Sequence, residues 1–255
     1  WTAFGSPMAG DALVFTGALR GTSVNSLLSG SVISGLTIDE GAGSFALLGN
    51  AFSLAGDVSV TSMNSQSIAN SLVFTGAHSF FLPTSRQQLT LSGLLSGSGH
   101  GFIKEGAGLL SLTTSANTYS GPTVVHGGTL SIDSDTRLGA VPVAVTAGNI
   151  VLNGGALRVT ASNVTINANR GIALGDGTPL SGGSINTGGF STLSYGGVLS
   201  DNGAANSLTK TGAGIVALSG TNSYTGNTIV DQDRLTLNYN AGSSLSILNP
   251  SSRLV

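Results

Sequence analysis

Two segments of the chain, residues 102–133 and 208–238, carry the same pattern, and this internal repeat limits the fold more than any other feature. The first begins Phe-Ile-Lys-Glu-Gly-Ala-Gly-Leu-Leu-Ser-Leu, and the second begins Leu-Thr-Lys-Thr-Gly-Ala-Gly-Ile-Val-Ala-Leu. After a one-residue change in length, both continue with Asn-x-Tyr-x-Gly. A repeat of this length is typical of a unit that cannot bury its own apolar face and therefore stacks on its neighbours.

Short alternating runs fill the chain between glycine-, asparagine- and serine-rich stretches. Apolar residues separated by one small residue have the period of a β-strand, with one face in a core and one toward water. The intervening glycines suit tight corners because they adopt positive φ without strain. The runs include Leu-Thr-Leu (89–91), Leu-Ser-Leu (110–112), Leu-Ser-Ile (130–132), Val-Ala-Val (143–145), Ile-Val-Leu (150–152), Val-Ala-Leu (216–218) and Leu-Thr-Leu (235–237). The sequence thus predicts an all-β chain of many short strands.

The composition excludes several classes of protein. Only 8% of the residues are charged and the net charge is −2, so the basic footprint that nucleic-acid binding needs is missing. The sequence has no cysteine, which excludes a disulfide framework and thiolate metal sites. No apolar run reaches the length of a membrane-spanning helix. No charged signal peptide with an apolar core is visible at Trp1, so we expect any export signal to lie outside these residues.

Stacked coils explain the repeat and the composition together. If one coil takes roughly 20–25 residues, the chain makes about ten to twelve coils, or rungs, spaced about 4.8 Å apart. The predicted fold is therefore a parallel β-helix, or β-solenoid, that runs through residues 1–255 as a single continuous unit. A weaker copy of the repeat is expected over residues 36–60, where Glu40–Gly43 repeats the Glu-Gly-Ala-Gly corner.

The segment 210–230 resembles a known family. Its pattern Lys-Thr-Gly-Ala-Gly-x-x-x-Leu-Ser-Gly-x-Asn-x-Tyr-Thr-Gly-x-Thr-x-Val is similar to the autotransporter-associated β-strand repeat of bacterial passenger regions, and residues 104–125 match nearly as well. The stretches 147–157 and 169–175 resemble the spacer between such repeats, and 10–15 resembles the same family. The resemblance implies a parallel β-helix exported to the bacterial cell surface, associated with the outer membrane, or to the extracellular space. At 232–234, Gln-Asp-Arg replaces the Gly-Gly-Thr corner kept at 127–129.

The repeat also predicts which residues form corners and core. We expect the repeated glycines to occupy tight corners with positive φ or with no room for a Cβ atom. The predicted corner residues are Gly106, Gly108, Gly121, Gly212, Gly214 and Gly226. The predicted interior residues are Leu110, Leu112, Val125, Leu130, Ile132, Val216, Leu218, Val230, Leu235 and Leu237.

Acidic residues are the first candidates for chemistry, because some parallel β-helices cleave polysaccharides with two or three carboxylates on one face. Two Asp-x-Asp pairs follow corresponding strands, Asp133 with Asp135 and Asp231 with Asp233, and alternate residues of a strand point the same way. Solvated corners explain both pairs more simply. Gly175-Asp176-Gly177 is the nearest fragment to a calcium-binding repeat, but it does not recur in tandem. We therefore expect no metal, no cofactor and no convergence of these acids with Asp201.

Histidine, lysine and tyrosine give weaker signals. His78, His100 and His126 lack metal-ligand spacing, and His126 is expected at the surface. Lys104 and Lys210, the only lysines, occupy equivalent positions. Each could form part of a charged stripe for an anionic ligand, but a stem covering the coil and an ammonium reaching solvent or a corner carbonyl is the favoured interpretation. Tyr119 and Tyr224 could stack on sugars, but packing over a corner with a hydrogen-bonded hydroxyl is favoured.

These observations favour a non-catalytic structural or adhesive rod on a bacterial surface or in an extracellular assembly. Its expected partners are neighbouring repeats or identical subunits, with surface glycans and host or cell-surface receptors as candidates, and no nucleic acid. One alternative is a self-assembling filament subunit that stacks head to tail. A second is a carbohydrate-active β-helix enzyme. A third, ice binding through a flat threonine face, is disfavoured because Thr-x-Thr does not recur regularly.

The two ends of a solenoid expose unpaired backbone groups unless something covers them. Residues 241–255 read as strand-forming, with Leu-Ser-Ile at 245–247, and Trp1 and Phe4 make the beginning apolar. We therefore expect both ends to be covered by further polypeptide or by a neighbouring copy.

Overall fold

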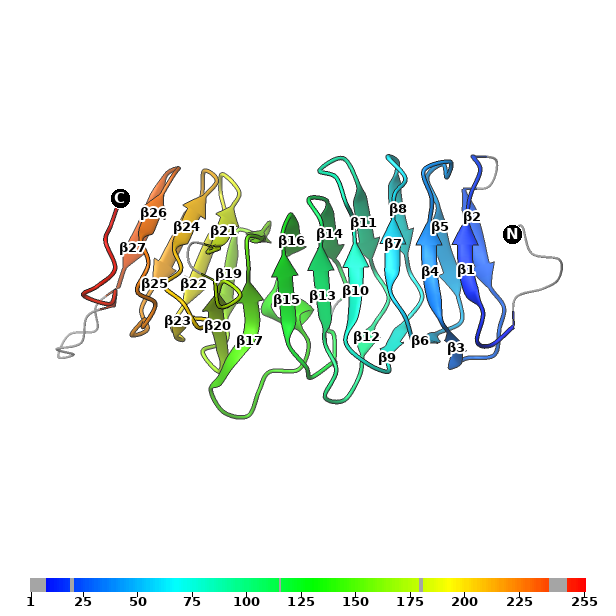
Figure 1. Cartoon of the computed structure of the whole chain (residues 1–255), viewed down its shortest axis with the longest axis horizontal. Coiled ribbons are helices and arrows are strands. Elements are labelled where there is room, and N and C mark those ends of the chain that lie inside the picture. The colour runs from blue at the N-terminus through cyan, green and yellow to red at the C-terminus, as the bar shows by residue number, and fades with distance from the viewer. Residues whose placement is uncertain (1–7, 19–20, 115, 179–180, 239–246) are drawn as a thin grey trace.

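The computed structural model describes residues 8–18, 21–114, 116–178, 181–238 and 247–255. These residues form 27 β-strands and one 3-10 helix, η1 (Asp135–Leu138). The strands lie across the long axis of the molecule, with β1 (Ala12–Phe15) near one end and β27 (Arg234–Leu237) near the other (Figure 1). The chain is thus an elongated stack.

Four sheets make up the sides of this stack, and we number them 1 to 4. Sheet 1 contains β1, β4 (Gly35–Ile38), β7 (Val58–Val60), β10 (His78–Phe81), β13 (Phe102–Glu105), β15 (Thr123–His126), β17 (Thr146–Leu152), β20 (Arg170–Leu174) and β23 (Leu199–Asp201). Sheet 2 contains β2 (Thr22–Asn25), β5 (Ala46–Gly49), β8 (Ser65–Ile68), β11 (Gln88–Leu91), β14 (Leu109–Leu112), β16 (Thr129–Ile132), β18 (Ala156–Val159), β21 (Gly183–Thr187), β24 (Leu208–Thr211) and β26 (Thr228–Val230). Sheet 3 contains β3 (Ser31–Ile33), β6 (Phe52–Leu54), β9 (Leu72–Phe74) and β12 (Leu95–Ser96). Sheet 4 contains β19 (Asn163–Ile166), β22 (Thr192–Tyr195), β25 (Ile215–Leu218) and β27.

Every strand pairs in parallel with the equivalent strand one coil away. Ala12 lies opposite Gly35 at one end of sheet 1, and Lys104 lies opposite Val125 in its middle. The ten strands of sheet 2 correspond to ten coils, which at about 4.8 Å per coil gives an axis of about 48 Å. The predicted all-β parallel β-helix is confirmed, and its coil number lies at the lower bound of the predicted range.

A continuous apolar core runs along the inside of the coils. Alternate residues of most strands are buried, as in β13 and β14, and the buried residues stack in rows from coil to coil. One such row on sheet 2 is Leu89, Leu110, Leu130, Leu157 and Ile185, all with 0% exposure. Because each apolar side chain packs on its counterparts above and below, no coil could bury this face alone.

The two strong repeats lie on different sides of the rod. In the first, β13 belongs to sheet 1 and β14 to sheet 2, whereas in the second β24 belongs to sheet 2 and β25 to sheet 4. The repeat is therefore rotated around the axis by one side between its two copies. The sequence gives no sign of this rotation.

In both repeats, an irregular segment takes the place of the third strand of the coil. Residues 116–122 run along sheet 3, where the amide of Thr118 donates to the carbonyl of Leu95 at 2.8 Å. Residues 219–227 run along sheet 1, where the amide of Ser223 donates to the carbonyl of Leu199 at 2.8 Å. The Asn-x-Tyr-x-Gly pattern of the repeat thus encodes a non-strand side of the coil.

The predicted weaker copy over 36–60 is built differently from the other two. Its corner joins β4 to β5 through residues 39–45, whereas residues 106–108 and 212–214 suffice in the strong repeats. Gly41 and Gly43 also lack the positive φ found at Gly106 and Gly212. The local resemblance of Glu40–Gly43 therefore does not extend to the backbone. In the described ranges, no helix is long and apolar enough to cross a bilayer.

Candidate functional site: the repeat corners and the Arg170 network

The first glycine of each strong corner has a left-handed backbone. Gly106 and Gly212 both have φ +76°, where an L side chain is strained. A Cβ atom at Gly106 would overlap the carbonyl oxygen of Leu82, and one at Gly212 would overlap that of Thr187. Each glycine therefore lets the corner approach the backbone of the preceding coil.

The remaining predicted corner glycines have ordinary φ but no space for a side chain. A Cβ atom at Gly108 would overlap the Leu82 side chain, and one at Gly214 would overlap the carbonyl oxygens of Gly188 and Ser191. The same holds where Gly121 crosses residues 100–101 and where Gly226 crosses residues 206–207. Close contact between coils, rather than chain reversal alone, therefore requires glycine at these four positions.

Lys104 points into the interior of the corner that follows β13. Its side chain is fully buried, and its ammonium donates to the carbonyls of Glu105 at 2.9 Å, Gly106 at 2.7 Å and Gly127 at 3.5 Å. Burial lowers the pKa of Lys104 from 10.5 to about 8. Because Gly127 belongs to the next coil, the ammonium ties two successive corners together.

Lys210 repeats this arrangement on the other side of the rod. Its ammonium donates to the carbonyls of Thr211, Gly212 and Gln232, and the last of these lies on the next coil. Burial again lowers the pKa of the lysine. Of the two predicted destinations of the ammonium, solvent and corner carbonyl, the structure shows the carbonyl, so neither lysine offers a charge to an anionic ligand.

The asparagine of each repeat bridges three coils. Asn117 accepts from the amide of Leu95 in the coil before and donates to the carbonyl of Arg137 in the coil after, at 2.9 and 2.8 Å. Asn222 makes the corresponding bonds to the Leu199 amide and the Ile247 carbonyl, both at 2.8 Å. These side chains satisfy buried backbone groups that the missing third strand would otherwise have paired.

The repeat tyrosines pack inside the coil with their hydroxyls hydrogen bonded. Tyr119 is fully buried, and its hydroxyl lies 2.7 Å from the hydroxyl of Thr123. Tyr224 is equally buried and pairs with Thr228 in the same way. Burial raises the pKa of both phenols. Tyr119 also meets Phe102 and Phe74 edge-on, at centroid distances of 5.6 and 5.9 Å, so neither tyrosine is presented to a sugar.

Seven of the ten predicted core residues are buried, and three are only half-buried. The buried residues are Leu110, Leu112, Val125, Leu130, Ile132, Val216 and Leu218. Val230, Leu235 and Leu237 are half-buried, and the two leucines pack against the core. They lie on β26 and β27, the last strands of their sheets among the described residues. Beyond β26 the chain adds only the short segment 253–255, and beyond β27 the described residues add no strand.

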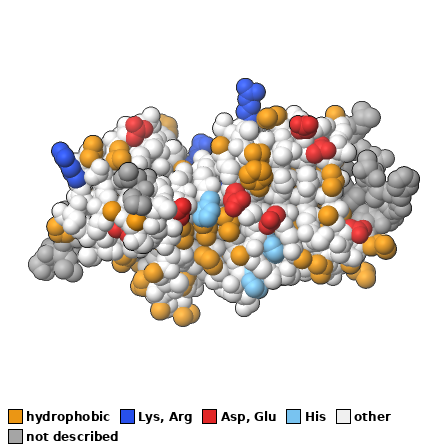
Figure 2. Space-filling model, viewed as in Figure 1, with side chains coloured by type: hydrophobic (Ala, Val, Ile, Leu, Met, Phe, Trp, Pro, Cys, Tyr) orange, Lys and Arg blue, Asp and Glu red, His pale blue; other side chains and the backbone are white. Residues whose placement is uncertain are grey.

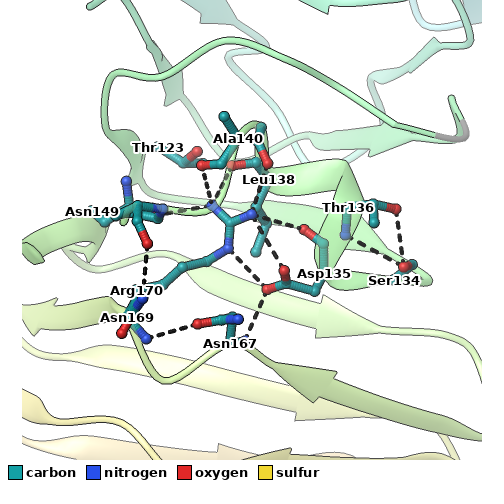
Figure 3. A network of polar contacts seen from close by, with 12 residues as sticks. Thr123, Ser134, Asp135, Thr136, Leu138, Ala140, Asn149, Asn167, Asn169 and Arg170 are labelled. Atoms are coloured by element: carbon teal, nitrogen blue, oxygen red, sulfur yellow. Dashed lines mark hydrogen bonds and ion pairs between the residues drawn. The ribbon is translucent and has the colours of Figure 1, made fainter. Parts of the chain in front are cut away.

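Arg170 is a fully buried arginine that fixes the connection between β16 and β17. Its role was not predicted from the sequence. Arg170 begins β20, and its guanidinium donates to the carbonyls of Leu138 at 2.8 Å and Gly139 at 2.7 Å. It also forms an ion pair with Asp135, whose Oδ1 lies 2.9 Å from Nε. Figure 3 shows these groups converging from η1, the chain after it and β17. The sequence signal for this network was an arginine at the start of an otherwise apolar strand.

The Arg170 network explains why the Asp-x-Asp hypothesis is wrong for residues 133–135. Ser134 caps η1, so Asp135 starts a helical turn instead of continuing the strand. Asp135 pairs with Arg170, whereas Asp133 pairs with Arg137 at 2.6 Å. The two carboxylates therefore have different partners and do not form a shared site.

The other acidic side chains also lie apart. Asp231 and Asp233 are exposed, and Asp201 accepts from Asn206 and Thr225. Asp176 accepts from Thr178 and Ser181 in its own turn, and these bonds hold its pKa well below the usual range. No group of three or more potential metal-ligating side chains occurs in the described part of the chain.

The three histidines have different environments. His126 is exposed and His100 is half-buried. His78 is 8% exposed, and its Nε2 has no hydrogen-bond partner among the described residues. The predicted surface position holds for His126, and burial of His78 was not predicted.

The surface carries few charges, and a hollow lies on one side of the rod. Figure 2 shows Lys, Arg, Asp and Glu side chains scattered singly among uncharged ones on the face in view. The hollow, of about 410 Å³, lies on the side formed by sheet 2. Its lining includes the side chains of Ser184, Thr209, Asn227 and Ile229, and no charged side chain contributes to it.

In comparison with known proteins, a family model matches the two repeats that contain these corners. The family model of the Passenger-associated-transport-repeat matches residues 102–132 and 208–232. The chain carries this repeat twice. It is also 41% identical over 152 residues to the adhesin BmaC autotransporter of Brucella suis biovar 1 (strain 1330). That similarity covers 58% of this chain but only 4% of the relative. No solved structure matches.

The resemblance drawn from the sequence is thereby confirmed at the two repeats, which match the passenger-associated family model. The matched residues contain Lys104, Asn117 and Tyr119 in the first repeat and Lys210, Asn222 and Tyr224 in the second. The family pattern therefore coincides with the side chains that connect each coil to its neighbours.

Proposed function

We propose that this chain is a single continuous, non-catalytic section of an adhesive rod on a bacterial surface. The observation that carries the proposal is the stack of ten coils joined by repeats of the passenger type, together with the similarity to an autotransporter adhesin. A stack of this kind holds its two ends at a fixed separation and leaves its lateral surfaces accessible to binding partners. Adhesion belongs to the relative by name, and for this chain it is a proposal.

The mechanism of such a rod is mechanical. Backbone hydrogen bonds join each strand to the coils on both sides, and the apolar rows continue without a break from coil to coil. Lys104 and Asn117 add bonds between coils where the third strand is missing. Pulling one coil away therefore breaks a sheet row, a core row and these side-chain bridges together. We expect a stiff body that needs neither disulfides nor metal ions.

The arrangement of the acids supports a role without catalysis. A glycosidase or lyase needs carboxylates within reach of one sugar ring. Here Asp133 and Asp135 are each bound to an arginine, and Asp176 accepts bonds within its own turn. A carbohydrate-active enzyme would therefore have to use acids that are already engaged.

A bead assay tests adhesion directly. Beads coated with residues 1–255 should adhere to cultured epithelial monolayers more than beads coated with the Leu130→Asp variant, whose core is disrupted. Equal adhesion of the two coatings at equal density would contradict an adhesive role for this section.

Glycans are the ligand class that the hollow on sheet 2 suits best. Hydroxyl and amide groups with one apolar residue match the alternating polar and apolar faces of a sugar. Thr209→Arg should fill the hollow and abolish binding on a glycan array. Thr90→Arg, on an outward position of the same sheet away from the hollow, should leave binding unchanged. If glycan binding on the array were unchanged by Thr209→Arg, the hollow would not be the binding site.

A filament subunit is the second candidate, and one observation favours it. The edge of β26 accepts a further parallel segment, because the amide of Thr228 donates to Arg253 and the amide of Val255 donates to Thr228. A strand from a neighbouring copy could use the same pattern if it displaced residues 253–255. Light scattering over a concentration series should show growing mass if copies stack, and a constant monomer mass would rule the filament out. The predicted strand run at 245–247 lies partly outside the described residues, and so do Trp1 and Phe4.

A further inference from the structure

The connection between β16 and β17 is the longest between consecutive strands in the described ranges. It spans residues 133–145, and most corners take only a few residues. Figure 1 shows the chain that leads into β17 hanging below the neighbouring coils. This connection therefore projects from the side of the rod instead of lying along it.

The two flanks of the projecting loop are fixed. On one side, Arg170 binds the carbonyls of Leu138 and Gly139, and it reaches Ala140 at 3.3 Å. On the other side, the amide of Thr146 donates to Asn169 at 2.9 Å and leads into β17. The tip between these anchors is held only by the bond from Asn169 Nδ2 to the carbonyl of Pro142 and by the local bond from Thr146 Oγ1 to the carbonyl of Ala144.

The tip is exposed and apolar. Val143 is 103% exposed and Val145 is 63% exposed, and Ala144 between them is exposed as well. These valines contribute little to the core and offer no charge. Exposed apolar side chains that do not contribute to the stability of the fold often mark a site of recognition.

The residue types at the tip fit one class of endopeptidase. Elastase-class serine proteases accept small apolar side chains in a shallow specificity pocket. Val143 supplies such a side chain, and Pro142 before it restricts φ toward the extended form in which proteases bind their substrates.

We propose that the peptide bond between Val143 and Ala144 is a cleavage site for an elastase-class endopeptidase. Water adds across this bond: the C–N bond breaks, Val143 gains the carboxylate and Ala144 becomes a new amino terminus. Residues inside the sheets resist such attack because their backbones are hydrogen bonded to coils on both sides.

Cleavage here leaves the rod assembled. The fragments 1–143 and 144–255 remain joined by β15 with β17 and by β16 with β18, and the Arg170 network spans the nick. The proposed site therefore converts a continuous chain into two associated chains without releasing either. This inference does not depend on adhesion.

The test is limited digestion of residues 1–255 with elastase, followed by intact mass measurement and gel filtration. We expect cleavage between Val143 and Ala144, with both fragments eluting together at the position of the uncut chain. Failure of this bond to cleave while a denatured sample is digested would overturn the proposal. Release of separate fragments after the cut would overturn the claim that the rod stays assembled.

Two variants separate recognition from mere exposure. Val143→Asp should slow cleavage of this bond by at least about tenfold, because an apolar pocket rejects a charged group. Val73→Asp, a change to a partly exposed valine in β9, should leave the rate unchanged. An unaltered rate for Val143→Asp, measured at the same bond, would contradict elastase-type recognition.

Discussion

The two strong repeats share their residues but not their surroundings. The first lies on sheets 1 and 2 in the middle of the rod, and the second lies on sheets 2 and 4 near the end of the described chain. In both, the lysine binds corner carbonyls and the asparagine bridges the coils before and after it. The motif therefore specifies a corner and its hydrogen bonds to neighbouring coils. It does not specify which sheets of the rod the repeat occupies.

The difference between the copies lies in how well the coil is covered. Leu130 in the first repeat is fully buried, and its counterpart Leu235 is half-buried. Stability should thus depend on position in the stack more than on the motif itself, as in other repeat proteins where each unit is stabilised by its neighbours.

The largest expected effect separates these two leucines. Leu130→Ala should lower the free energy of unfolding by about 2–5 kcal/mol, because it leaves a cavity in a closed row of the core. Leu235→Ala should cost only about 1–2 kcal/mol, because the side chain is partly exposed already. Urea denaturation followed by circular dichroism measures both, and equal losses would show that coverage is not what distinguishes the repeats.

The corner glycines should behave alike in the two copies. Gly106→Val and Gly212→Val should each cost about 1–3 kcal/mol, because both residues have positive φ and face a carbonyl of the preceding coil. Gly189→Ala is the control, since nothing lies within 4 Å of its Cβ position. If thermal unfolding showed a loss at only one of the two corners, the corners would not be equivalent.

A smaller effect is expected from the tyrosine hydroxyls. Tyr119→Phe should destabilise the chain by about 1 kcal/mol, because Thr123 loses its buried partner. Tyr224→Phe should cost less, because the hydroxyl of Thr228 also lies 3.0 Å from that of Ser252. The control, Thr123→Val with Tyr119→Phe, removes both members of one pair and should recover part of the loss. A double variant as damaging as the sum of the single changes would mean that the pair does not interact.

A further effect concerns pH. The pKa of Lys104 falls from 10.5 in the unfolded chain to about 8 on folding, so the folded state binds fewer protons between these values. The free energy of unfolding should therefore rise as pH increases from about 8 to 10. Above about pH 10 it should fall again, because tyrosines with raised pKa ionise only after unfolding. Lys104→Met with Lys210→Met should abolish the rise, and a rise that persisted would have another origin.

The sequence predicts most of the coil but little of what lies between coils. Alternation and the repeat were enough for the parallel β-helix, because strand period and corner glycines are local properties. The Arg170 network could not be foreseen, since Arg170 and Asp135 lie 35 residues apart and meet only through the stacking of coils. The rotation of the second repeat was equally hidden, because it depends on how many sides each intervening coil contains.

The disfavoured Asp-x-Asp alternative fails for a reason that sequence spacing does not show. It assumed that Asp133 and Asp135 continue a strand, but Ser134 caps a 3-10 helix at that point. The weaker copy over 36–60 differs from the strong repeats in a related way, because Glu40–Gly43 repeats the residues of a corner without its positive φ. The corner motif predicted the backbone correctly only where the strand sequences on both sides of it were repeated too.

The register of the stack can be measured directly along one outward row of sheet 2. Ser67, Thr90, Ser111, Ser131, Arg158, Asn186 and Thr211 lie in successive register across this row. Because the chain has no cysteine, Ser67→Cys with Thr211→Cys gives two unique sites for spin labels. Six coil spacings predict a narrow distribution of distances near 29 Å by double electron–electron resonance. A broad distribution, or a distance well outside that range, would contradict the stack of parallel coils on which the account rests.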